Sequence, residues 1–160
     1  MPAAEKLVFR RLEDGERELA GELAASAAGW NAPEMERFGK MEGPAPAAVE
    51  PWGLFIKGTL CGLARFVPPV GKSAEVTALL LAKSWWRTGL SAWMLEELAA
   101  AAGRSGASEI LVRLSGAGGA AGEILVEAGF SGPDPSDAAY PDGSWRRSAG
   151  GSGRAKTKEM

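Results

Sequence analysis

The chain has 160 residues, of which 46% are hydrophobic and 24% charged, so it can bury the core of one globular domain. Its formal net charge of -2 gives no general electrostatic attraction to nucleic acid, and we expect no nucleic-acid partner. It contains no histidine and a single cysteine, Cys61. These counts exclude an internal disulfide and argue against a metal site and against Ser-His-Asp chemistry.

The two ends of the chain carry no sign of membrane insertion. Residues 1–5 lack the charged and then apolar pattern of a signal peptide, and no apolar run approaches the roughly 20 residues that a membrane span needs. The last segment, GGSGRAKTKEM, is polar and of low complexity. We therefore expect a cytoplasmic protein without membrane association, with one domain over residues 1–148 and a flexible polar tail over 149–160.

The N-terminal part of the chain predicts a strand and two helices. KLVFRRL, residues 6–12, is typical of a strand. The segment after it begins with acidic residues and places Leu19 and Leu23 four positions apart, which predicts an amphipathic helix. Asn31 can cap a second, short helix in which Pro33 occupies the first turn.

The middle of the chain predicts three strands after a loop over residues 41–51. Residues 52–67 hold two apolar runs that break at Lys57-Gly58-Thr59, as in a hairpin that Pro68 and Pro69 end. AEVTALLLAK, residues 74–83, is nearly continuous in apolar residues and predicts a central strand. Regular alternation would place four of its side chains on one face: Glu75, Thr77, Leu79 and Leu81.

The C-terminal part predicts two further helices with a strand between them. Apolar residues recur at helical spacing from Leu90, and Gly103 suits the end of that helix. EILVRL, residues 109–114, predicts a strand, and residues 117–130 predict a glycine-weakened helix that closes at Gly129. The whole order indicates a mixed α/β layer protein.

The stretch WWRTGLSAW, residues 85–93, lies where the central strand gives way to a helix. A helix N-terminus exposes unpaired N–H groups, and glycine lets a ligand approach the backbone closely, so this corner suits a phosphate or pyrophosphate. The alternative is a plain turn whose tryptophans pack on the core, because one glycine is a weak phosphate motif. The residues whose amides or side chains would contact the anion are Arg87, Thr88, Gly89, Leu90 and Ser91.

The succession of elements over about residues 6 to 130 resembles the GNAT superfamily of acetyl-CoA-dependent N-acetyltransferases. In that family the fourth strand leads into an Arg/Gln-x-x-Gly-x-Gly/Ala turn that holds the CoA pyrophosphate. Here Gly89 is kept, while Trp86 stands at the leading position and Ser91 at the last one. The resemblance implies an α/β (α+β) fold with a mixed, mostly antiparallel central sheet flanked by about four helices.

The resemblance also implies acetyl transfer from acetyl-CoA to a primary amine by direct attack, without a metal. Some family members carry a glutamate base fourteen residues before the motif glycine, and Glu75 stands there, although it is equally described as a solvated charge at a strand end. The backbone of Leu79, Leu80 and Leu81 would pair with the pantetheine arm and polarise the thioester. Thr77 and Trp30 are the candidate contacts to the amine substrate.

Two departures weaken the resemblance in the fourth helix of the family. Its tyrosine, which protonates the departing thiolate, corresponds to Leu125, and its asparagine corresponds to Gly118. Water, Ser115 or Tyr140 are the alternatives as the acid, although Tyr140 is also explained as a turn aromatic. These departures keep a second reading open, in which a GNAT-fold module binds acyl-CoA or a protein partner without efficient catalysis.

The identity of the amine is not defined by this sequence, which is compatible with a small-molecule or a peptide acceptor. The final strand candidate, SWRRS, is poor in apolar residues. That end of the sheet is therefore expected to be short or to be completed by a partner, such as a second copy of the chain in a homodimer.

Overall fold

The computed structural model describes residues 7–30, 50–85, 88–113, 119–134 and 144–149 of the chain. Its strands are β1 (Leu7–Arg11), β2 (Ala28–Trp30), β3 (Glu50–Ile56), β4 (Thr59–Val70), β5 (Ser73–Leu81), β6 (Glu109–Arg113), β7 (Ser131–Asp134) and β8 (Ser144–Ser148). Its helices are α1 (Arg17–Ala24), α3 (Leu90–Arg104) and α4 (Gly119–Glu127), with short 3-10 turns η2 (Asp14–Glu16) and η3 (Lys83–Trp85). None of the helices in these ranges is long and apolar enough to cross a bilayer.

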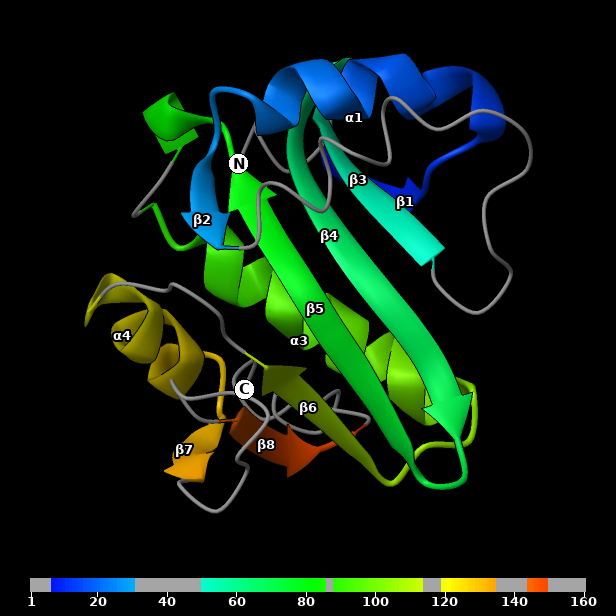
Figure 1. The fold of residues 1–160 in the computed structure, drawn as a ribbon, viewed down its shortest axis with the longest axis vertical. Coiled ribbons are helices and arrows are strands. Elements are labelled where there is room, and N and C mark those ends of the chain that lie inside the picture. The colour runs from blue at the N-terminus through cyan, green and yellow to red at the C-terminus, as the bar shows by residue number, and fades with distance from the viewer. Residues whose placement is uncertain (1–6, 31–49, 86–87, 114–118, 135–143, 150–160) are drawn as a thin grey trace, which may run out of the picture.

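All the strands in the described ranges belong to one eight-stranded sheet, in the order β1-β3-β4-β5-β6-β8-β7 with β2 added beside β5 (Figure 1). Every pairing is antiparallel except that of β5 with β6, which α3 connects as a crossover helix. The sheet confirms the prediction of a mixed, mostly antiparallel architecture. The described ranges hold three α-helices rather than about four, and the predicted helix after Asn31 lies outside them.

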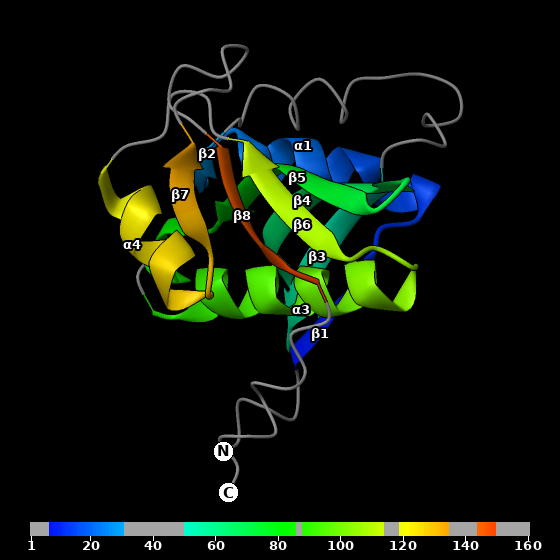
Figure 2. The same cartoon turned by 90° about the horizontal axis from the view of Figure 1, so that it is seen from below.

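The sheet separates two layers of helix, as Figure 2 shows: α1 covers one face, and α3 and α4 cover the other. The larger core cluster lies between the sheet and α3, where side chains such as Phe66, Met94 and Leu98 are buried. The smaller cluster lies under α1 and includes Leu12, Ala20 and other residues of the opposite face. We call these two sides of the sheet the α3 face and the α1 face.

The β4 strand corrects one sequence prediction. Pro68 and Pro69 were expected to end the hairpin, but β4 continues through both to Val70. The β4–β5 pairing shifts register between Val67 and Val70, so neither proline has a paired position in the ladder. A bulge tolerates the missing proline N–H, which explains why the strand continues.

A second register shift changes the course of β5. Arg65 pairs with Ala78 while the next β4 residue, Phe66, pairs with Val76, so Thr77 is an extra residue in β5. Such a β-bulge turns the side chains after it to the other face. Val76, before the bulge, packs in the α3-face core. After the bulge, Leu79 packs in this core, whereas strict alternation would have placed Ala78 there.

The bulge contradicts the predicted alternation along β5. Leu79 and Leu81 pack on the α3 face, and Leu80 packs on the α1 face. Glu75 alternates with core residues of the α3 face and therefore lies on the α1 face with Thr77. The four side chains predicted to share one face are thus divided between two, because the inserted residue changes the phase of the strand.

Candidate active site

The strands β5 and β6 separate at the bulge. Their parallel pairing covers Ser73–Val76 of β5 and Glu109–Val112 of β6. Beyond it β5 continues to Leu81, whereas β6 ends at Arg113, and Figure 1 shows the two strands diverging. The divergence leaves the backbone of the second half of β5 without β6 as a neighbour. A strand edge of this kind can accept another extended chain.

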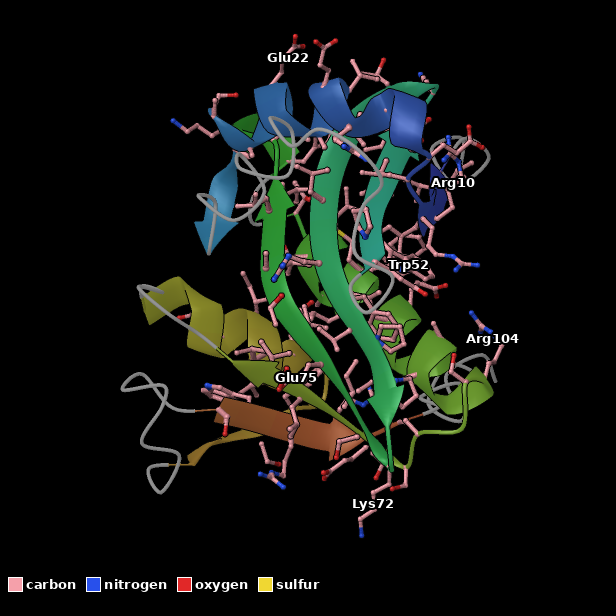
Figure 3. The ribbon with its side chains drawn as sticks, turned by 45° about the vertical axis from the view of Figure 1, so that its right-hand side comes forward. Arg10, Glu22, Trp52, Lys72, Glu75 and Arg104 are labelled. Carbon is pink, nitrogen blue, oxygen red and sulfur yellow. The ribbon has the colours of Figure 1, made fainter. Side chains whose placement is uncertain are left out.

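Three polar side chains gather on the α1 face at the point of divergence. Arg65 Nη1 donates a hydrogen bond to Thr77 Oγ1 at 3.3 Å. Glu75 is half-buried and lies between its pairing partners Val67 of β4 and Leu111 of β6. Figure 3 places it over the junction of β5 with β6. The group combines a proton-accepting carboxylate with a hydroxyl and a guanidinium beside the opened strand edge.

The edge of β5 beyond the bulge is paired with β2 in this structure. Ala28, Gly29 and Trp30 pair with Leu81, Leu80 and Leu79, respectively. The leucine side chains are fully buried in the two cores, so a ligand could reach these positions only through the backbone. The predicted contact between Trp30 and a substrate is not tested here, since the structure describes only its backbone pairing.

Gly89 is the N-cap of α3 and adopts φ 92° and ψ −10°. This left-handed conformation favours glycine, which explains the residue at the turn between η3 and α3. A Cβ built on Gly89 would have a single neighbour within 4 Å among the described residues, Glu127 Oε2 at 4.0 Å, and so would meet no steric obstacle. The first turn of α3 has no side-chain cap at Gly89, so its amides are available to an anion.

The residues around Gly89 give mixed support to the predicted anion site. Thr88 Oγ1 donates to the Trp85 carbonyl oxygen at 2.5 Å and so stabilises the turn itself. Ser91 is 3% exposed, and its Oγ has no hydrogen-bond partner in the described part of the chain. Leu90 is half-buried and packs against the α3-face core. Trp86 and Arg87 lie outside the described residues.

Glu127 is a feature of this corner that the sequence analysis missed. It is the last residue of α4 and is exposed, and its carboxylate lies near the N-cap of α3. A carboxylate there interacts favourably with the helix dipole and competes with any other anion. Nothing local in the sequence connects two residues that are 38 positions apart, so only the packing of α4 beside α3 reveals it.

The structure describes one of the positions considered for a catalytic acid, and it describes Cys61. Leu125, at the position of the family's tyrosine, is fully buried in the α3-face core and does not line an open site. Gly118, Ser115 and Tyr140 lie outside the described residues. Cys61 is a buried free thiol, and desolvation by burial raises its pKa. Among the described residues, no three acidic or cysteine side chains are grouped to bind a metal.

A separate hollow of about 700 Å³ lies at the opposite end of β5, near Lys72 (labelled in Figure 3). Two of its basic side chains, those of Arg146 and Arg147, are engaged within the protein. Arg146 Nη1 lies 3.4 Å from Glu109 Oε1, and Arg147 Nη1 donates to the Ala128 carbonyl oxygen at 2.8 Å. None of the residues that line this hollow belongs to the polar group of Arg65, Glu75 and Thr77, and we assign it no part in the site.

The sequence matches no known protein-family profile and no curated protein. Solved structures are nevertheless similar over nearly the whole chain. The ribosomal-protein-S18-alanine N-acetyltransferase of Escherichia coli superimposes with a TM-score of 0.67 at 17% identity, covering 89% of this chain and 94% of that one. The aminoglycoside acetyltransferase AAC(6′)-Ib, in complex with ribostamycin and coenzyme A, gives 0.70 at 16% identity, with 96% and 99% covered.

A spermidine N-acetyltransferase of Vibrio cholerae gives a TM-score of 0.64 at 15% identity, covering 90% of this chain and 94% of that one. At these identities the likeness establishes the fold. The chain therefore has the fold of the GNAT acetyltransferases, as its order of elements predicted.

Proposed function

We propose that this protein is an acetyl-CoA-dependent N-acetyltransferase that transfers the acetyl group to a primary amine by direct attack. The observation that carries the proposal is the divergence of β5 and β6 at the Thr77 bulge, with Glu75 on the face beside it. The fold adds support, because the similar structures are acetyltransferases and AAC(6′)-Ib was solved with coenzyme A.

The residues at the N-terminus of α3 fit the phosphates of the cofactor. No described atom lies closer than 4.0 Å to a Cβ built on Gly89, and the buried Ser91 hydroxyl has no partner among the described residues. The uncapped N–H groups of the first turn would bind the pyrophosphate, and the β5 backbone from the bulge to Leu81 would hold the pantetheine arm. When bound, acetyl-CoA supplies the thioester that carries the activated acetyl group.

Glu75 would act as the general base. An alkyl ammonium has a pKa of about 10 and cannot attack a thioester until it loses a proton, which a carboxylate can accept directly or through water. Thr77 would position the amine by hydrogen bonding, held in turn by Arg65. The acceptor we propose is a small-molecule or peptide amine, and the proposal includes a cytoplasmic location.

The test combines calorimetry with an acetylation assay on a panel of small-molecule and peptide amines. We expect acetyl-CoA to bind the parent protein, and Glu75→Gln to lower kcat by about 100-fold or more without changing that affinity. The matched control is Glu109→Gln, which removes a half-buried carboxylate that bonds Ser73 at 2.6 Å. Full activity in the Glu75 variant would refute the base assignment, and absence of acetyl-CoA binding would refute the function.

The second candidate is a GNAT-fold module that binds acyl-CoA or a protein partner without efficient catalysis. The burial of Leu125 favours it, since no acid stands at the position where the family places its tyrosine. The two candidates differ in one result: a protein that binds acetyl-CoA but acetylates no amine in the panel is the binding module.

A further inference from the structure

The pairing of β2 with β5 has a consequence for any ligand of the β5 edge. One side of β5 pairs with β4 along most of its length, including Leu79–Leu81. The other side pairs with β6 up to Val76 and with β2 from Leu79 onward. Figure 1 shows β2 beside the far end of β5, within the divergence. Both edges of β5 at Leu79–Leu81 are therefore occupied by the chain itself.

A strand edge offers one row of N–H and C=O groups, which one partner at a time can use. The pantetheine arm is an extended chain with amide groups, so it would bind this edge as a strand does. It cannot pair with Leu79–Leu81 while β2 is there. Binding of the cofactor arm and pairing of β2 are mutually exclusive at these three positions.

The β2 strand has the features of a segment that can leave. It is only three residues long, and its central residue is Gly29, which weakens a strand because it has no side chain to pack and loses more freedom on ordering. The preceding turn is anchored to α1, where Ala27 N donates to the Leu23 carbonyl oxygen at 2.9 Å. Release of β2 can therefore leave α1 in place.

We propose that β2 is a displaceable strap that closes the cofactor edge of β5, and that acyl-CoA binds only after the strap leaves. This inference rests on the proposed function. It assigns Ala28–Trp30 a regulatory role at the same site: the apparent affinity for acetyl-CoA is reduced by the fraction of molecules in which the strap is closed. Any partner or covalent change that holds β2 away from β5 would activate binding.

Two proline variants test the strap, Ala28→Pro and Gly29→Pro. Neighbouring N–H groups of a strand point to opposite sides, so at least one variant removes a donor from the β2–β5 ladder. Hydrogen exchange at Leu79–Leu81 in the ligand-free protein identifies the released variant. Asp14→Pro is the control for proline itself, because Asp14 is the second residue of the turn closed by the Glu16 N–H and the Glu13 carbonyl oxygen, a position that favours proline.

Calorimetry with acetyl-CoA then gives the result. We expect the released variant to bind acetyl-CoA about tenfold more tightly than the parent, as for a strap closed in roughly nine-tenths of molecules. The control Asp14→Pro should bind with the affinity of the parent. In the parent, acetyl-CoA should speed exchange at Ala28–Trp30 while Leu79–Leu81 stay protected, because the ligand replaces the strap.

Two other results would distinguish failure of the strap proposal from failure of the proposed function. If parent and released variant bind acetyl-CoA equally, and exchange at Ala28–Trp30 is unchanged by ligand, the cofactor binds elsewhere on the fold and the strap is refuted while the function stands. If neither binds although exchange shows β2 released, the proposed function is refuted, and the strap with it.

Discussion

Two substitutions of Gly89 distinguish the effect of a negative charge at the α3 N-terminus from the effect of any side chain on the left-handed backbone there. Gly89→Asp places a carboxylate at the proposed pyrophosphate site, and Gly89→Asn places a neutral group of the same size there. Both residues tolerate the left-handed conformation at φ 92° better than other non-glycine residues. The added Cβ makes only an ordinary contact, with Glu127 Oε2 at 4.0 Å. The difference between the two variants therefore reports charge.

The stability of the two variants follows from the backbone. The left-handed conformation costs roughly 1–2 kcal/mol for a residue with a Cβ and less for Asn or Asp, and 1 kcal/mol lowers Tm by about 2–4 °C in a domain of this size. We expect Tm to fall by no more than about 5 °C in either variant. The dipole of α3 favours the charge of Asp and offsets its repulsion by Glu127, so the Asp variant should be no less stable than the Asn variant.

The affinities for acetyl-CoA should follow the opposite order, with Gly89→Asp binding more weakly than Gly89→Asn. Unit charges about 6 Å apart at a partly exposed site repel by about 1–3 kcal/mol, which corresponds to about 5- to 150-fold in affinity. Calorimetric titration with acetyl-CoA should show this loss in Gly89→Asp relative to Gly89→Asn, and added salt should narrow the gap. Equal affinity of the two variants at low salt would refute an anion site at the start of α3.

Three further changes test other parts of the structure. Glu127→Gln should tighten acetyl-CoA binding about 2- to 5-fold at low salt by removing a competing anion, with Glu123→Gln as the control on the same helix; an unchanged affinity contradicts the competition. The pKa of Glu16 is lowered to about 2, first by the hydrogen bond from Arg10 and then by the Glu13 N–H. Because the folded pKa lies below the unfolded one, this pair stabilises the fold above about pH 4.5 and loses its contribution as the pH falls toward 2. Glu16→Gln should abolish that part of the acid dependence in urea unfolding, by about 1 kcal/mol at most for a surface pair, and an unaltered pH profile would show that the pair contributes nothing. Leu125→Tyr should destabilise by about 1–3 kcal/mol through overpacking without raising kcat; an unchanged Tm with higher activity would place this position in the open site.

The sequence by itself determined the elements whose signals are local. The apolar spacing from Leu90 predicts α3, and the structure has it over Leu90–Arg104 with Gly89 as its N-cap. The break at Lys57-Gly58-Thr59 predicts the hairpin of β3 and β4. Helical periodicity and turn residues act within a few positions of one another, so they can be read without knowing the fold.

Only the tertiary structure decided which side chains and strand edges of these elements come together at the candidate site. The bulge at Thr77 arises from the pairing of β5 with β4 and moves Leu79 and Leu81 to the face opposite Glu75. The pairing of β2 with Leu79–Leu81 and the position of Glu127 beside Gly89 also appear only in the folded structure. Each depends on contacts between segments far apart in the chain. Register and helix packing are set by which surfaces bury each other, and no local pattern records that choice.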